Sequence, residues 1–115
     1  MIHVSIWLED EIIVGFEIKG HAGYADKGYD IICSAVSAIS YTAVGYFENK
    51  YNPEGKMDKI SYIESDGYMK FTRPISTNSK EIIKDNAVLE AMVLGFKQVE
   101  YSYGSKFVRV KEEEV

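Results

Sequence analysis

Two residues that could do chemistry together lie close in the sequence. Cys33 is the only cysteine of the chain, and His21, one of its two histidines, precedes it by twelve residues. A thiolate is a strong nucleophile, and an imidazole can take up and return a proton near neutral pH. The pair predicts nucleophilic catalysis in which Cys33 attacks and His21 acts as general base and then as general acid.

The segment after Asp30 has the spacing of an amphipathic helix. Its apolar positions recur at helical intervals: Ile32, Val36, Ile39, Ala43 and Tyr46. Asp30 is the predicted N-cap, so Cys33 lies in the first turn, where unpaired N–H groups and the helix dipole favour a thiolate. An ionised Asp30 opposes this effect, whereas a protonated His21 nearby more than compensates for it. The amides around Ser34 and Ala35 are expected to hold the oxyanion of acyl transfer.

His21 and Cys33 are not forced together by their spacing, because twelve extended residues span about 40 Å. Gly20 ends a predicted strand directly before His21, and the glycines that follow predict a mobile loop over residues 22–29. If that strand packs beneath the helix, the strand end and the helix start face each other across the loop. The two side chains would then meet.

Other interpretations of these residues stay open at this point. A lone cysteine in a helix of small residues is more often a buried small hydrophobe, and a histidine beside glycine is as often a loop residue bonded to backbone. Gly20, Gly23, Ser34 and Ser37 are candidate substrate-binding residues, although packing is favoured for Ser37. His3 is expected to be exposed and without a special role.

The remaining side chains do not predict a metal or cofactor site. One cysteine and two histidines are too few for a zinc site, and Asp26 and Asp30 do not complete one. The segment GYADKG lacks the spacing and the Lys-Ser/Thr end of a phosphate-binding loop.

The elements around the site predict an α+β fold. Apolar residues alternate over residues 2–8 and 12–18, which indicates a hairpin of two strands. A helix from Asp30 to about Lys50 follows, with a turn at residues 52–55. A second hairpin is expected over residues 59–73 around Asp66-Gly67, stopped by Pro74.

The last part of the chain predicts a helix and a strand. Asn78 and Glu81 resemble a capping box, Gly104 is a plausible stop, and KFVRV at residues 106–110 is the final strand. The order ββαββαβ indicates two helices packed on a mainly antiparallel mixed sheet. Residues 1–115 are expected to form a single domain.

Charge and composition narrow the classes of partner. The net charge is −5, and no cluster of basic residues is present, which disfavours direct nucleic-acid binding. A basic protein segment would be attracted, weakly at physiological salt. The run Glu112 to Glu114 is expected to be a solvated tail.

The predicted location is the cytoplasm. One cysteine cannot form an intramolecular disulfide, and the N-terminus MIHVSIWLEDE lacks the basic start of a signal peptide. The uncharged run from Ile31 to Phe47 is 17 residues long but contains serines, a threonine and a tyrosine. A buried core helix is therefore favoured over a membrane span.

The segment GHAGYADKGYDIICSAVSAIS closely resembles the signature of the ribosomal-processing cysteine proteases, the Prp family. In that signature Gly-His-Ala-Gly precedes Asp-Ile-x-Cys-Ser-Ala-Val-Ser. The segments LEAMVLGFKQVEYSYG and KFVRV are also similar to the family, so the resemblance spans nearly the whole chain.

The resemblance implies a cytosolic homodimeric endopeptidase without metal or cofactor. Its substrate would be the precursor of a large-subunit ribosomal protein, from which it removes a short N-terminal extension. By position, Cys33 matches the nucleophile and His21 the general base and acid. Asp30 matches a family aspartate with an auxiliary role, either orienting His21 or capping the helix. The glycine loop would close over an extended peptide.

Two alternatives belong to other functional classes. One is a non-catalytic ribosome-associated factor that binds a ribosomal protein on the same scaffold without cutting it. The other is a redox-sensing thiol protein. Alkylation of Cys33 against pH would separate these, because only a Cys-His pair makes the reactivity of the thiol depend on His21.

Overall fold

The computed structural model describes residues 1–26, 30–55 and 60–115. Within them the chain forms five strands and two helices in the predicted order ββαββαβ. The bounds of the elements are β1 (Ile2–Glu9), β2 (Ile12–Lys19), α1 (Ile31–Tyr51), β3 (Ser61–Ser65), β4 (Tyr68–Thr72), α2 (Ser79–Tyr103) and β5 (Val108–Glu114). Lys59, the predicted start of the second hairpin, lies outside the described residues.

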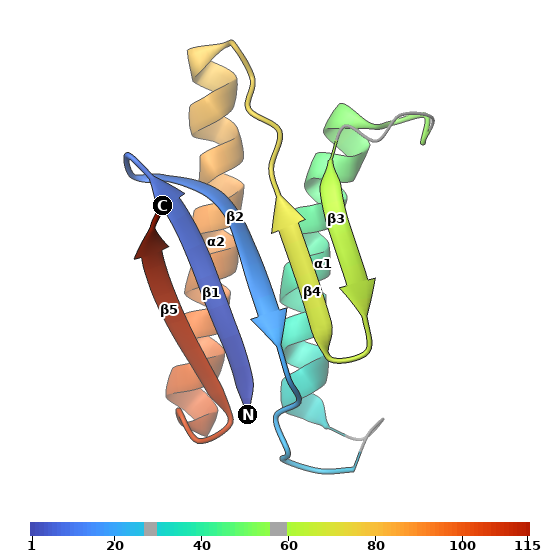
Figure 1. Ribbon diagram of the computed structural model, residues 1–115, viewed down its shortest axis with the longest axis vertical. Helices are drawn as coiled ribbons and strands as arrows, with labels where there is room; N and C mark the ends of the chain where they lie inside the picture. The colour runs from blue at the N-terminus through green and yellow to red at the C-terminus, as the bar shows by residue number, and fades with distance from the viewer. Residues whose placement is uncertain (27–29, 56–59) are drawn as a thin grey trace.

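The strands form one mixed sheet with both helices on the same face (Figure 1). The strand order is β3-β4-β2-β1-β5, in which β1 and β5 are parallel and the other neighbours are antiparallel. The predicted α+β fold with a mainly antiparallel mixed sheet is confirmed. β3 lies at one edge of the sheet and β5 at the other.

The core lies between the sheet and the helices. Alternating residues of β1 point into it, as the period of two predicts, with Ile2, Val4 and Ile6 all buried. Phenylalanine rings from four elements meet at its centre, where the ring of Phe71 lies 5.4 Å from those of Phe16 and Phe47. Full burial of one such side chain stabilises the fold by roughly 1.5–3 kcal/mol.

α1 is long and apolar enough to cross a membrane by length and composition alone. Core helices of globular proteins meet the same criterion. Here its inner face packs into the core through Ile32, Val36, Ala43 and Phe47, all of them buried. This packing agrees with the buried core helix that the sequence favours.

A buried carboxylate, which the sequence did not predict, lies between the helices. Asp85 of α2 accepts hydrogen bonds from Tyr46 at 2.7 Å, from Lys50 at 2.6 Å and from Tyr51. The buried guanidinium of Arg73 lies 3.8 Å away. Burial opposes the charge on the carboxylate, but the hydrogen bonds from Lys50 and the two tyrosines outweigh it and lower the pKa of Asp85.

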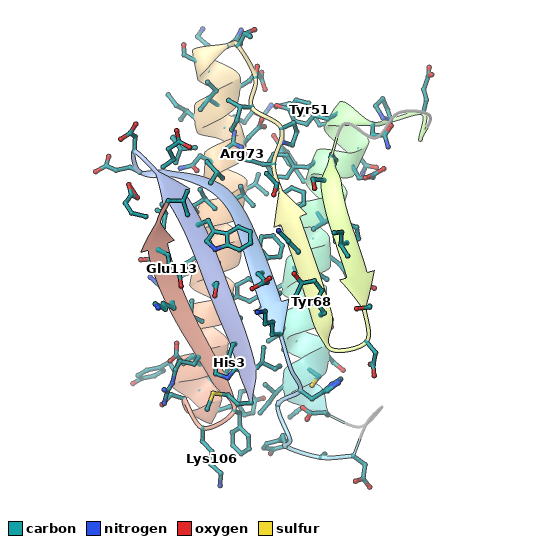
Figure 2. All side chains as sticks on the ribbon, viewed as in Figure 1. His3, Tyr51, Tyr68, Arg73, Lys106 and Glu113 are labelled. Carbon is teal, nitrogen blue, oxygen red and sulfur yellow. The ribbon has the colours of Figure 1, made fainter. Side chains whose placement is uncertain are left out.

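This cluster lies at one end of the molecule. Figure 2 shows Tyr51 and Arg73 at the opposite end from His3 and Lys106. His3 is exposed, as expected, and pairs with Lys19, the last residue of β2. The Asp85 cluster therefore holds α1 and α2 together far from the end of the sheet where β2 leads into the glycine loop.

The capping box predicted at Asn78 is only half correct. The side chain of Asn78 accepts hydrogen bonds from the N–H groups of Lys80 and Glu81, as an N-cap does. The Glu81 carboxylate, however, binds Lys50 of α1, a residue far away in the sequence. The ammonium of Lys50 offers a charged partner that the backbone amide of the N-cap does not.

The predicted solvated tail at the C-terminus is wrong. Residues Glu112 to Glu114 continue β5, where they pair in parallel with Ile6 to Leu8 of β1. The ladder is made by backbone groups, so acidic side chains do not prevent it, and at an edge strand they still reach solvent. The side chain of Glu112 also forms an ion pair with Lys97, with 3.1 Å between Oε1 and Nζ.

Candidate active site

Three segments meet at the end of the sheet where β2 stops: residues 20–26, the start of α1 and the turn between β3 and β4 (Figure 1). Gly20 donates its N–H to the carbonyl of Gly67 at 2.8 Å, which joins the first segment to the turn. The φ of Gly20 is +96°, and a Cβ there would lie 2.3 Å from the carbonyl oxygen of Met1. Only glycine fits this close approach.

Asp30 caps α1 and also holds the loop. One of its carboxylate oxygens accepts the N–H groups of Ile32 at 3.0 Å and Cys33 at 3.1 Å. The other accepts those of Tyr24 at 3.0 Å and Ala25 at 3.4 Å. Burial opposes the charge, but the four backbone donors outweigh it and lower the pKa of Asp30. Among the described residues it has no hydrogen bond to His21, so the geometry agrees with the capping role.

Cys33 lies half-buried in the first turn of α1, as the sequence predicts. Its Sγ accepts the backbone N–H of Ala22 at 3.4 Å. Ala22 directly follows His21, so the loop returns to the helix start within one residue of the histidine.

His21 lies beside the turn between β3 and β4. Its side chain is 54% exposed, and its Nε2 lies 3.9 Å from Oδ1 of Asp66. The ring also contacts Gly67, because a Cβ placed there would be 2.8 Å from Nε2. No hydrogen bond between His21 and Cys33 is present in the described part of the chain, but both side chains line the same pocket.

The pocket has a volume of about 700 Å³ and runs along the start of α1. Its lining includes four of the predicted substrate-binding residues: Gly20, Gly23, Ser34 and Ser37. Ser37, for which the sequence favours packing over a place in the pocket, is half-buried and lines this pocket. On the opposite wall lie residues 64–69 of the β3–β4 hairpin. Tyr41 donates to Glu64 at 2.9 Å and thereby bridges the two walls.

The amides of Ser34 and Ala35, the predicted oxyanion donors, lie where helical hydrogen bonding begins. The N–H of Ser34 donates to the carbonyl of Asp30 at 3.1 Å, which is the first hydrogen bond of the helix. Ala35 lies one position further in, where helical N–H groups bond to carbonyls four residues back, and its side chain packs against the core. Only the first turn leaves amides unpaired, and Asp30 occupies two of those.

The loop predicted as mobile is anchored in its described part. Ala22 is buried, and the ring of Tyr24 packs against Tyr103 and Phe107 with centroids 5.9 Å and 5.3 Å away. The other residues of the prediction, 27–29, lie outside the described residues.

The sequence of the chain matches a known family over residues 1–108, and that family is described as cysteine protease Prp. The chain belongs to the cysteine protease Prp family. It is therefore a cysteine protease, and Cys33, its only cysteine, lines the pocket described above.

Two relatives from the Prp family match this chain over most of their own length. The ribosomal processing cysteine protease Prp of Bacillus subtilis is 30% identical over 94 residues, which cover 82% of this chain and 81% of that protein. The protein of the same name from Staphylococcus aureus is 26% identical over 104 residues, covering 90% and 92%.

Solved structures share the fold. The Staphylococcus aureus protease Prp with a covalently linked product peptide superposes with a TM-score of 0.77 at 24% identity, covering 98% of this chain and all of that one. The Streptococcus mutans protein SMU.848 gives a TM-score of 0.74 at 28% identity, covering 100% and 96%. The five-stranded mixed sheet with two helices is thus the Prp fold.

Sequence reasoning missed the residues that surround His21. Asp66 and Gly67 were interpreted only as turn residues, because Asp-Gly between two strands is a strong hairpin signal. Ala22 has no side-chain chemistry, so its backbone contact with sulfur had no signal in the sequence. Glu64, which accepts a hydrogen bond from Tyr41 and lines the pocket, gave no signal either, because a long segment of helix and loop separates it from Cys33 in the sequence.

Proposed function

We propose that this Prp-family chain is an endopeptidase that removes an N-terminal extension from a large-subunit ribosomal protein, with Cys33 as nucleophile and His21 as general base and acid. The observation that carries the proposal is the pocket that both side chains line, at the N-terminus of α1. Relatives that match over most of this chain are named ribosomal processing cysteine proteases, which supports the class of substrate.

The reaction begins with the transfer of the thiol proton of Cys33 to His21. The thiolate is stabilised by the N–H of Ala22 and by the start of α1. Asp30 places a negative charge in the same turn. Four backbone N–H groups donate hydrogen bonds to its carboxylate and partly offset that charge.

The thiolate then attacks the carbonyl carbon of the scissile peptide bond, and the electron pair of the C=O bond moves to oxygen. The N–H of Ala22, which lies 3.4 Å from the sulfur, then donates to the oxyanion that forms beside it. Collapse of this intermediate breaks the C–N bond, and His21 gives its proton to the leaving amine. Water, deprotonated by His21, then hydrolyses the thioester.

The pocket suits an extended and basic peptide. The first turns of α1 and the β3–β4 hairpin both line it, and its volume is about 700 Å³. Glu64 and Asp66 place negative charge on one wall, and the chain carries a net charge of −5. Basic residues of a ribosomal protein would be attracted to this surface. The described loop, tied down by Asp30 and Tyr24, lines the same pocket through Gly23 and Ala25.

The proposal is tested by incubating a ribosomal-protein precursor with the wild-type protein, Cys33→Ala and His21→Ala, and measuring the products by mass spectrometry. The wild type should release one N-terminal peptide, and both variants should release none while retaining the circular dichroism and melting temperature of the wild type. Cleavage by Cys33→Ala would contradict the proposal. Tight binding of the precursor by the wild type without any product would instead favour a non-catalytic binding factor.

The proposed enzyme works in the cytosol as a homodimer. Ribosomal proteins are made there, and the reducing conditions keep a catalytic thiol free. Light scattering during gel filtration should give about twice the mass of the chain, 13.0 kDa. A monomeric mass at micromolar concentration would contradict the dimer without affecting the assignment of Cys33.

A further inference from the structure

The turn between β3 and β4 is fixed relative to the backbone of His21. β2 pairs with β4 as far as Lys19 opposite Tyr68. The hydrogen bond from Gly20 to Gly67, at 2.8 Å, extends this pairing by one residue beyond the strands. His21 therefore leaves the sheet directly beside the turn, and sheet hydrogen bonds hold the two together.

The imidazole ring of His21 lies against Gly67. Its φ is +69°, and a Cβ at this position would lie 2.8 Å from Nε2 and 3.4 Å from both neighbouring ring carbons. Carbon atoms do not approach other heavy atoms so closely without displacement. Any side chain at position 67 would occupy the place of the ring.

Asp66 presents a carboxylate to the same ring. Its Oδ1 lies 3.9 Å from Nε2 of His21, and both side chains are more than half exposed. A general base becomes positively charged during the reaction, and a nearby negative charge stabilises that state. Because Nε2 faces Asp66, Nδ1 is the nitrogen left to exchange a proton with Cys33.

We propose that Asp66 and Gly67 position His21 for the reaction of Cys33. Gly67 leaves the space that the ring occupies, and the negative charge of Asp66 attracts the Nε2 side of the ring, so that Nδ1 takes the proton of the thiol. The proposal rests on the proposed function of Cys33 and His21. Both turn residues act through His21 and are positioning residues.

Gly67→Ala tests the contact with the ring, and Gly55→Ala is its matched control. Gly55 has a φ of +63°, close to that of Gly67, but a Cβ there meets nothing within 4 Å. Both substitutions strain the backbone alike, and only Gly67→Ala displaces the imidazole. Displacement by about 1 Å lowers the rate of an enzyme by roughly 100-fold. We expect a loss of this size in kcat for Gly67→Ala and less than about a twofold change for Gly55→Ala.

Asp66→Asn tests the carboxylate, with Asp66→Glu as the variant that restores the charge. The expected effect is a fall in kcat of about 2- to 5-fold with little change in KM, as for other exposed ion pairs. Asp66→Glu should regain part of the lost kcat. Asp66→Asn is isosteric and is expected to melt at the temperature of the wild type, so folding does not obscure the result.

A double-mutant cycle separates positioning from a merely structural role. The rate of Cys33 alkylation by iodoacetamide is measured in the wild type, Asp66→Asn, His21→Ala and the double variant. Asp66→Asn should slow alkylation when His21 is present and have no effect in the His21→Ala background. Equal effects in both backgrounds, full activity of Gly67→Ala, or equal losses in Gly67→Ala and Gly55→Ala would each overturn the inference.

The two proposals fail in different ways. If the wild type cleaves no precursor, the proposed function is wrong, and the alkylation cycle still tests whether Asp66 acts on Cys33 through His21. If the wild type cleaves and Gly67→Ala and Asp66→Asn cleave equally fast, the proposed function stands and only the role of the turn is wrong.

Discussion

The backbone N–H of Ala22 donates to the Sγ of Cys33 at 3.4 Å. This contact joins the segment that leaves β2 to the first turn of α1. The sulfur therefore lies against the residue that directly follows His21, although the side chains of His21 and Cys33 are not hydrogen-bonded in the described structure. This hydrogen bond therefore joins the start of α1 to the loop segment that carries His21.

Replacing sulfur by oxygen should separate folding from catalysis. In Cys33→Ser the hydroxyl oxygen can still accept the N–H of Ala22, so the melting temperature is expected to stay within about 2 °C of the wild type. A serine hydroxyl is a much weaker nucleophile near neutral pH, and cleavage should fall by about 1,000-fold or more. Precursor cleavage followed by mass spectrometry measures the loss. Cleavage within tenfold of the wild type would contradict the role of the thiolate.

The two functions of Asp30 can be measured apart. Asp30→Ala removes the cap of α1 and should lower the free energy of unfolding by about 1 kcal/mol, within a range of roughly 0.5–2 kcal/mol. Asp30→Ser keeps a capping oxygen but loses the second oxygen that binds the loop. It should unfold in urea like the wild type and cleave more slowly. If Asp30→Ser cleaves at the wild-type rate, holding of the loop by Asp30 does not matter for activity.

Tyr24 anchors the described part of the loop. Its ring packs edge-on against Tyr103 and Phe107. Tyr24→Ala should reduce cleavage while changing the free energy of unfolding by less than about 1.5 kcal/mol, because aromatic pairs contribute about that much. Tyr101→Ala is the control, since Tyr101 is 89% exposed. Comparable activity of the two variants in the cleavage assay would contradict an anchoring role.

Asp85 should be the most sensitive polar position of the core. Asp85→Ala leaves the buried guanidinium of Arg73 without its carboxylate, and loss of one partner of a buried pair costs about 3–5 kcal/mol. Urea unfolding of the wild type and Asp85→Ala at neutral pH measures the difference. Glu114→Ala, at an exposed position of β5, should change stability by less than about 0.5 kcal/mol. A small effect at Asp85 would mean that the cluster is not a stabilising unit.

Acid should destabilise the protein through the same carboxylates. The pKa values of Asp85 and Asp30 are lowered in the folded state from the ordinary value of 3.8. A lowered pKa contributes stability that is fully present above the ordinary value and is lost as the pH falls through the folded value. Unfolding in urea should show a constant free energy above about pH 5 and a decline below about pH 4. In Asp85→Asn this decline should be smaller, and an equal decline would contradict the role of Asp85.

Much of the fold was predictable because its signals are local. The alternation in β1 and β2, the Asp-Gly turn and the N-caps at Asp30 and Asn78 all depend on residues within a few positions of each other. Glu81 is a residue for which the local signal failed. Its spacing from Asn78 predicted a hydrogen bond to the backbone of the N-cap, but its carboxylate binds Lys50 of α1. The continuation of β5 through three glutamates was likewise decided by its neighbour β1 and not by its own residues.

The sequence by itself determined the order of the elements, the family and the pair Cys33 and His21, because residue type and short-range backbone geometry encode them. The tertiary structure decided what surrounds that pair. It alone brought Asp66 and Gly67 to the imidazole and Arg73 to Asp85, because the strand order β3-β4-β2 and the packing of the two helices join residues far apart in the chain. Local periodicity carries no information about such contacts, since they depend on how whole elements pack in space.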